Sequence, residues 1–104
     1  MYIREAHPTD GWALPKNKFQ ITDPKTIAER RQVAKTFAAD LKVSIPILVD
    51  TLDDQVESVY AGWPDRIYII DRDGKIAHKG APGPGGFRPS VTAAPAILDG
   101  LLKR

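Results

Sequence analysis

The hydrophobic positions along the chain change period several times, and each change marks a predicted element. Residues 2–6 read as a short strand, and residues 45–49 form a β-branched and aliphatic run that suits a parallel strand covered on both faces. Residues 24–42 instead carry apolar side chains at helical spacing, with Asp23 as the expected N-cap and Pro24 in the first turn. Because a helix joins the two strands, we expect a right-handed crossover between parallel strands.

The second half of the chain contains a hairpin pattern. Residues 67–70 form a wholly apolar run, and residues 71–74 separate it from a second strand pattern at 75–79. The separating segment ends in Gly74, which readily adopts the left-handed conformation that such turns require. We therefore predict two antiparallel strands joined by a tight turn.

Two further helices flank the hairpin pattern. Thr51 and Asp54 have the spacing of a capping box at the start of the first helix, and Pro64 ends it. In the second helix, Pro95 is tolerated only in a first turn, so Thr92 is the expected cap. The order of elements predicts an α/β domain with a mixed sheet, in which ligands bind beyond the carboxyl ends of the parallel strands.

Composition limits the size and the partners of the protein. Its 104 residues, 42% of them hydrophobic, suit a single domain over 1–104. The 15 basic and 13 acidic side chains are dispersed, so no nucleic-acid partner is expected. Since the chain shows neither an apolar stretch of ~18 residues nor a signal-peptide pattern, the default expectation is a soluble, cytoplasmic protein. The absence of cysteine excludes a thiol nucleophile within these residues.

Few side chains are candidates for chemistry. Glu5 and His7 are two residues apart at the end of a predicted strand, so they share a face, and a carboxylate beside an imidazole can orient it. A solvated pair is the plainer alternative. Asp65 is expected at the same edge of the sheet if the first hairpin strand runs antiparallel to the others. The acidic group at 50–54 is better explained by helix capping than by a cation, so no metal and no cofactor are expected.

Five segments resemble the iodothyronine deiodinase family of thioredoxin-like proteins. The most specific is Glu-Ala-His-Pro-Thr-Asp-Gly-Trp at 5–12; segments 47–51, 65–70, 74–76 and the Gly/Pro loop at 80–86 follow in the family's order. The resemblance implies a selenocysteine or cysteine oxidoreductase that removes iodide reductively from thyroid hormones. Its partners would be a small-molecule substrate and a thiol reductant, with a homodimer as a further option. The implied fold is α/β and thioredoxin-like, a mixed sheet with helices packed on it, lacking the N-terminal central strand and first helix.

The resemblance also implies catalytic roles for particular residues. By match to the family motif, Tyr2, Glu5 and His7 would belong to a relay that supplies a proton at the halogenated ring. Asp65 falls where the family has an acidic relay residue. Displacing iodide from an aromatic carbon leaves a carbanion-like site, and a histidine backed by carboxylates can deliver the proton that this site needs.

Three departures from the family pattern keep the function open. The family's nucleophile segment would precede residue 1, a second catalytic histidine is replaced by Pro24, and the arginine that clamps the hormone is replaced by Pro82. The expected protein is therefore a deiodinase-like oxidoreductase that is inactive as this fragment. The alternatives are a thiol peroxidase-like redoxin and a non-enzymatic thioredoxin-like binding module. Without the central strand, we expect either a strand-wide gap or a makeshift direct pairing between strands 2–6 and 66–70, and a chain that is at best marginally stable alone.

Overall fold

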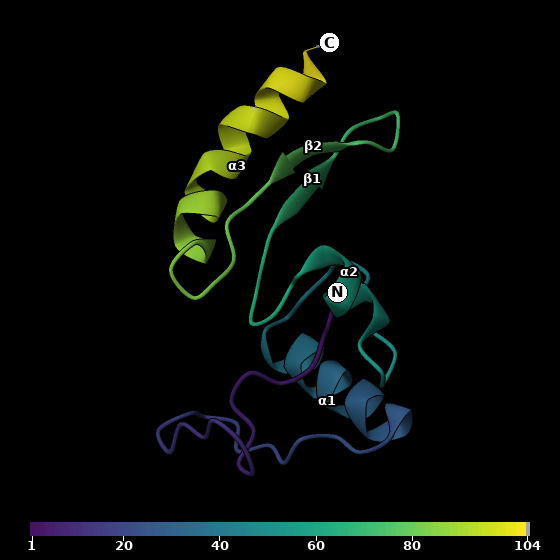
Figure 1. The fold of residues 1–104 in the computed structure, drawn as a ribbon, viewed down its shortest axis with the longest axis vertical. Helices are drawn as coiled ribbons and strands as arrows, with labels where there is room; N and C mark the ends of the chain where they lie inside the picture. Colours follow the sequence, from purple (N-terminus) through teal and green to yellow (C-terminus); the bar gives the residue numbers. More distant parts are fainter. Residues whose placement is uncertain (104) are drawn as a thin grey trace. The chain divides into compact units, whose positions relative to one another are not determined.

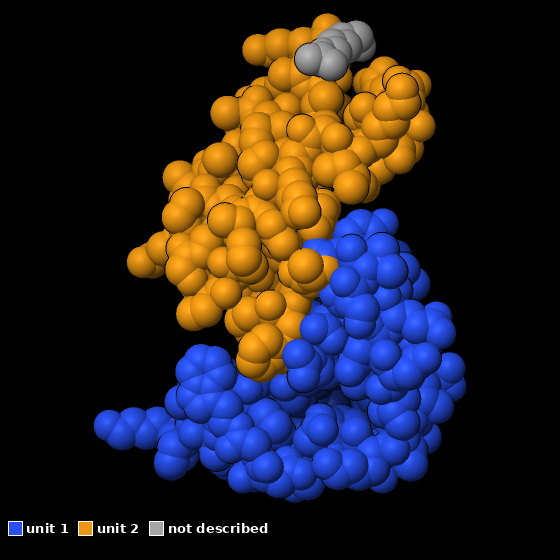
Figure 2. All heavy atoms as spheres, in the orientation of Figure 1, with its two compact units in different colours: residues 1–60 blue, residues 61–104 orange. Residues whose placement is uncertain are grey.

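A computed structural model describes residues 1–103 of the chain. The chain forms two compact units, residues 1–60 and the residues from Ala61 onward (Figure 2). Helices and strands follow in the mixed α/β order of Figure 1: α1 (Ile27–Asp40), α2 (Gln55–Tyr60), β1 (Tyr68–Ile70), β2 (Ile76–Lys79) and α3 (Phe87–Leu102). None of the helices in this range combines the length and the apolar character that crossing a membrane requires. The α/β class is confirmed, and the single domain stays a prediction.

The first and second predicted strands are reduced to one pair of residues. Tyr2 and Val49 form an isolated parallel bridge. The Tyr2 N–H donates to the Leu48 carbonyl at 2.7 Å, and the Asp50 N–H donates to the Tyr2 carbonyl at 2.9 Å. The parallel direction is confirmed, but strands over 2–6 and 45–50 are wrong. A run of β-forming residues becomes a strand only where consecutive residues find a partner, and here one pair does.

Helix α1 begins three residues later than predicted. Thr26 is its N-cap, because the Thr26 hydroxyl accepts a hydrogen bond from the Glu29 N–H at 3.1 Å. The Glu29 carboxylate in turn accepts from the Lys25 N–H at 2.8 Å. The predicted start at Asp23 and Pro24 is wrong, since the Thr-x-x-Glu spacing satisfies the first free backbone donors of the helix.

The start of α2 also differs from the prediction. Thr51 takes part in the cap, since its hydroxyl accepts from the first helical N–H at 3.2 Å. Asp54 does not cap the helix; its φ is 59°. The two following helical N–H groups donate instead to the carboxylate of Asp50, at 3.0 and 2.9 Å. The helix ends before Ala61, which has a φ of 49°, and therefore before Pro64.

The predicted hairpin is confirmed. Strands β1 and β2 pair antiparallel, with Ile69 opposite His78 and a register irregularity after Ile69. The Asp71 carboxylate accepts the backbone N–H groups of Asp73 and Lys75, both at 2.9 Å. Gly74 has a φ of 80°, the left-handed conformation that the turn requires.

Helix α3 begins five residues before the predicted cap. It starts at Phe87 and continues through Pro95, so the prediction of a start at Thr92 is wrong. Proline removes only one backbone donor, and the turn before it is held by other contacts. Ser90 is buried in that turn: its hydroxyl donates to the Gly86 carbonyl at 2.8 Å, and Gly80 approaches so closely that an added Cβ would lie 2.5 Å from the Ser90 oxygen.

The apolar core of each unit is small. Among the described residues, the buried hydrophobic side chains are Ala34 in the first unit and Ile69 in the second. Residues predicted to be buried lie at the surface, including Leu41, the C-cap of α1, which is 66% exposed. Leu48 and Val59 are 65% and 82% exposed. Hydrophobic burial therefore stabilises these units less than the sequence pattern suggests.

Candidate functional site

Tyr2 and Glu5, two residues of the predicted relay, are in direct contact. The Tyr2 hydroxyl donates a hydrogen bond to the Glu5 carboxylate. Burial raises the pKa of the Tyr2 hydroxyl far above its ordinary value, and the hydrogen bond to Glu5 raises this pKa further. Tyr2 therefore stays protonated at any physiological pH and acts as a hydrogen-bond donor that orients the carboxylate.

The ring of Tyr2 rests on aromatic residues of the same unit. Its centroid lies 6.1 Å from that of Phe37 on α1, and the Phe37 ring meets the Phe19 ring edge-on at 4.7 Å. These contacts, together with the backbone bridge to Val49, fix both the main chain and the ring of Tyr2. The hydroxyl that meets Glu5 is therefore held by packing on one side and by the bridge on the other.

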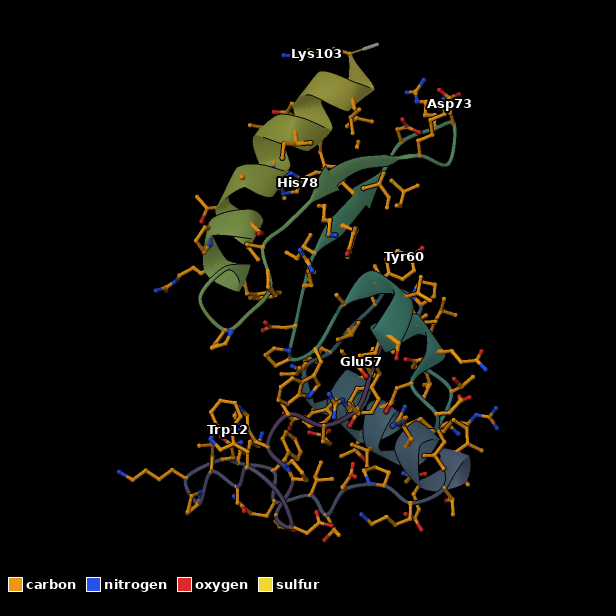
Figure 3. The ribbon with its side chains drawn as sticks, in the orientation of Figure 1. Trp12, Glu57, Tyr60, Asp73, His78 and Lys103 are labelled. Atoms are coloured by element: carbon orange, nitrogen blue, oxygen red, sulfur yellow. The ribbon has the colours of Figure 1, made fainter. Side chains whose placement is uncertain are left out.

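His7 has a different partner from the one predicted. Residues 3–7 form no strand, so the alternation that would place Glu5 and His7 on one face does not apply. The His7 Nδ1 instead lies 3.0 Å from the backbone carbonyl oxygen of Trp12, and the two rings meet edge-on with centroids 4.3 Å apart. Figure 3 shows Trp12 on the long loop that precedes α1, where its side chain is 54% exposed.

The carbonyl partner determines which His7 nitrogen carries the exchangeable proton. A carbonyl oxygen only accepts, so the His7 Nδ1 must hold a hydrogen to make this contact. In the neutral ring the lone pair is then on Nε2, and in the cation Nε2 carries the proton that can leave. The geometry suits a ring that gives up a proton from Nε2 and keeps the one on Nδ1.

A buried polar cluster lies behind the Tyr2 backbone. The Asp50 side chain is 1% exposed, and it accepts hydrogen bonds from the N–H groups of Thr51, Val56 and Glu57 at 2.8 to 3.0 Å. Burial disfavours its charge, but these backbone donors outweigh burial and lower the pKa of Asp50. Asp50 therefore stays ionised. Its carboxylate caps α2, and its own backbone N–H donates to the Tyr2 carbonyl.

Arg30 connects this cluster to α1. Its guanidinium is 3% exposed, donates to the Thr51 carbonyl at 2.7 Å and forms an ion pair with Asp54 at 3.0 Å. On the other side of the unit, Arg4 pairs with Glu57 of α2 at 3.2 Å. The segment that carries Tyr2, Glu5 and His7 is thus connected by polar contacts to both helices of its unit.

Asp65 lies in the second unit. Its backbone carbonyl accepts from the Gly83 N–H at 2.8 Å, and its carboxylate is packed against the Gly83 α-carbon. The Asp65 Oδ1 is buried and has no hydrogen-bond partner among the described residues. The convergence of Asp65 with Glu5 and His7 stays a prediction.

Three contributors to the site carried no assigned role in the sequence. Arg30 looked like one of several helix-surface charges, and Asp10 was part of the 5–12 motif without a function. Gln20 lay in a loop without periodicity. The signal for Asp10 was its place in the most specific motif; for Arg30 and Gln20 no sequence signal distinguished them, because their partners are backbone carbonyls that a side-chain pattern does not reveal.

The described residues hold no cluster of metal ligands, and the hollow beside α1 is not lined by Tyr2, Glu5 or His7. In the described part of the chain, no group of three or more His, Cys, Asp or Glu side chains is arranged to hold a metal ion. A hollow of about 460 Å³ lies between residues 18–24 and α1, lined in part by Phe19, Val33 and Glu29, and none of Tyr2, Glu5 and His7 lines it. The arrangement itself supports proton transfer and the orientation of a carboxylate.

Comparison with known proteins establishes the family. A family model described as iodothyronine deiodinase matches residues 1–95, a range that includes Tyr2, Glu5, His7 and Asp65. The chain belongs to the iodothyronine deiodinase family. The deiodinase resemblance seen in the sequence is therefore confirmed.

Deiodinases from several vertebrates are similar to this chain. Type I iodothyronine deiodinase of Xenopus laevis is 38% identical over 89 residues, which are 86% of this chain and 34% of that protein. Thyroxine 5-deiodinase of Sparus aurata is 33% identical over 88 residues, 85% of this chain and 32% of that protein. The same enzyme of Gallus gallus is 30% identical over 88 residues. The chain spans about a third of the length of these curated relatives.

Proposed function

We propose that this chain is the proton-supplying part of a deiodinase-type oxidoreductase. The observation that carries the proposal is the His7 contact, in which the Trp12 carbonyl holds Nδ1 and leaves Nε2 as the atom that gives up a proton. Tyr2 and Glu5 precede His7 by five and two residues and are hydrogen-bonded to each other. The same segment therefore also contains a carboxylate that the Tyr2 hydroxyl holds in place. Asp65 is the proposed acidic residue from the second unit.

The proposed reaction replaces a carbon–iodine bond by a carbon–hydrogen bond. A selenolate or thiolate takes the iodine, the two bonding electrons stay on the ring carbon, and His7 delivers the proton to that carbon. A thiol reductant then releases iodide from the nucleophile and restores it. Because the 104 residues contain no cysteine, we propose that the nucleophile comes from outside them.

The proposed substrate is an iodinated aromatic small molecule. Two of the relatives described above carry the name thyroxine 5-deiodinase, and a third is a type I iodothyronine deiodinase, which favours an iodinated aromatic ring as the substrate. Pro24 and Pro82 stand where, by the family resemblance, a histidine and the hormone-clamping arginine are expected. We therefore propose an aromatic iodide as the substrate, without a contact to the amino-acid end of the hormone.

The proposed complete fold is thioredoxin-like. The described residues contain two strand pairings: the parallel bridge of Tyr2 with Val49 and the antiparallel pair of β1 with β2. Tyr2 and β1 therefore each have a strand partner on one edge only. A central strand carrying the nucleophile would pair with both edges. Urea unfolding of this chain against a form extended by an upstream strand and helix tests the idea: we expect the longer form to be more stable by several kcal/mol. A cooperative transition of that size in the short chain contradicts it.

A second copy of the chain is a proposed partner. Many large apolar side chains are exposed, among them Leu48 and Val59, and exposed apolar surface is where subunits commonly associate. Sedimentation equilibrium at several concentrations tests this, and a monomer throughout the micromolar range contradicts it.

An activity assay on the extended protein tests the function. The DNA upstream of the first codon is sequenced for an in-frame strand followed by Cys or TGA, the extended protein is produced, and release of iodide from iodinated phenols is measured with dithiol as reductant. We expect iodide release that depends on the dithiol. Reduction of hydroperoxide without iodide release would favour the thiol peroxidase alternative, and neither activity would favour a binding module.

A further inference from the structure

The loop between His7 and α1 is closed on itself by polar contacts. The Thr9 N–H donates to the Ile21 carbonyl at 2.8 Å, and the Thr9 and Thr22 hydroxyls are 3.1 Å apart. The amide of Gln20 donates to backbone carbonyls across the loop, with Asn17 the nearest at 2.7 Å. Segments whose ends meet in this way have a defined shape without a core of their own.

Asp10 joins the start of this loop to the segment that enters α1. One of its carboxylate oxygens accepts from the Asp23 N–H at 2.9 Å, and the other is 3.2 Å from the Lys25 ammonium group. Both contacts lower the pKa of Asp10, the backbone hydrogen bond most. An exposed ion pair contributes little to stability, but a carboxylate that accepts from a backbone donor fixes the position of its own main chain.

The main chain next to Asp10 is the part that holds His7. The Gly11 N–H donates to the Pro8 carbonyl at 3.1 Å, and an added Cβ on Gly11 would lie 2.9 Å from the Pro8 side chain. The next residue is Trp12, whose carbonyl oxygen meets the His7 Nδ1. Since the turn is this tight, a shift at Asp10 moves the Trp12 carbonyl.

We propose that Asp10 is a positioning residue that keeps neutral His7 in the tautomer with the proton on Nδ1. It acts through the turn at 8–12: the carboxylate ties the turn to Asp23 and Lys25, and the turn presents the Trp12 carbonyl to the imidazole. The inference rests on the proposed function for its catalytic meaning, because this tautomer leaves Nε2 free for the substrate. The contacts that carry it all lie within the first unit.

The tautomer of His7 is directly measurable in the full chain. Long-range ¹H–¹⁵N correlation spectra, recorded at a pH where both histidines are neutral, distinguish Nδ1–H from Nε2–H, and His78→Gln identifies the signals of His7. In the unaltered chain we expect the Nδ1–H form to predominate. In Asp10→Ala, we expect the ratio of Nδ1–H to Nε2–H to fall by about 2- to 10-fold, the effect of losing one ordinary hydrogen bond.

Two further variants separate positioning from a general loss of structure. Lys25→Met removes the ion pair and keeps the Asp23 contact, so we expect a smaller change of the ratio than in Asp10→Ala. Asp40→Asn is the matched control, because it removes a comparable exposed contact, the 2.7 Å pair of Asp40 with Lys18, without touching the turn. We expect no change of the ratio in Asp40→Asn. If Asp10→Ala does not fold, Asp10→Leu, which has a similar shape and no acceptor, is measured in its place.

The outcomes distinguish this inference from the proposed function. A tautomer ratio in folded Asp10→Ala or Asp10→Leu equal to that of the unaltered chain overturns the positioning role. A changed ratio supports it whether or not the extended protein releases iodide. If the extended protein is active and Asp10→Leu changes the ratio but not kcat, the positioning of His7 stands, and turnover in His7→Ala decides whether His7 is the proton donor.

Discussion

Residues 1–60 and residues 61–103 both bury little apolar surface, but different contacts stabilise them. In the first unit, side-chain groups bond to backbone groups: Asp50 and Arg30 in the interior, Asp10 and Gln20 on the loop. In the second unit, backbone pairs with backbone across β1 and β2, and glycines bring segments into close contact. The candidate relay residues Tyr2, Glu5 and His7 lie in the unit that depends on side-chain polar groups.

The difference predicts how each unit responds to substitution. A side chain that satisfies several backbone donors is replaced at high cost, because its removal leaves those donors buried without acceptors. A hairpin keeps its backbone pairs when a side chain changes, but it is sensitive wherever an added methyl group has no space. The first unit should therefore be destabilised by substitutions that truncate a polar side chain, and the second by substitutions that add side-chain atoms.

The largest expected effect contrasts the histidines of the two units. In an extended, active protein, His7→Ala should lower turnover by about 10² to 10⁴, the usual contribution of a positioned acid or base. His78→Ala, in β2, should leave turnover within about twofold, since His78 is half-buried in the second unit and is not one of the relay residues. Steady-state iodide release measures both. An unchanged rate in His7→Ala contradicts the assigned role.

The next effect concerns the interior of the first unit. Asp50→Ala removes the acceptor of three backbone N–H groups and the charge near Arg30, so in the extended protein the free energy of unfolding should fall by about 3–5 kcal/mol. Asp53→Ala, at an exposed neighbouring position, should change it by about 0.5 kcal/mol or less. Urea unfolding followed by circular dichroism tests the pair, and equal midpoints for the two variants contradict the assignment.

A smaller effect is expected from adding a methyl group to a glycine of the second unit. A Cβ at Gly83 would overlap the Asp65 carboxylate, with the Asp65 Cγ 2.6 Å away, so Gly83→Ala should destabilise by about 1–3 kcal/mol. At Gly85 nothing lies within 4 Å of an added Cβ, and Gly85→Ala should shift stability by about 0.5 kcal/mol or less. Thermal unfolding of the two alanine variants compares them directly. If Gly85→Ala is the more damaging, the close packing of Asp65 against Gly83 is not what stabilises the loop.

The smallest predicted effect is the pH dependence due to Asp50. Its pKa is lowered in the folded chain, so its contribution is complete above the unfolded value of about 3.9 and is lost as the pH falls through the lower folded pKa. The slope for one proton is at most about 1.4 kcal/mol per pH unit. Urea midpoints between pH 6 and pH 2 should show this decline, and Asp50→Asn should flatten it. The same acid dependence in the variant would assign the decline to other carboxylates.

The hairpin and the family were both predictable from short stretches of sequence. The turn at 71–74 depends on the Asp71 carboxylate and on Gly74, which act within a few residues of each other. The family signal came from the 5–12 motif, which is contiguous in the chain. Both predictions were confirmed because the physical cause lay inside the segment that carried the pattern.

The candidate site was predictable only in part. Tyr2 and Glu5 were expected in one relay, and a hydrogen bond joins them in the structure, while their catalytic role stays a prediction. The predicted pairing of His7 with Glu5 gave way to the Trp12 carbonyl, because backbone acceptors carry no sequence signal. The shared edge with Asp65 stays a prediction.

Local chemistry in this chain is set by the residues themselves: where a turn must form, which segments favour helix, and which motif marks the family. The ends of the helices and the state of the polar side chains were decided in three dimensions. Asp50 caps α2 from five residues away, Ser90 packs where Gly80 leaves space, and α3 runs through Pro95. A carboxylate or hydroxyl can satisfy any backbone donor that reaches it, so its partner follows from the path of the chain and not from its neighbours in sequence.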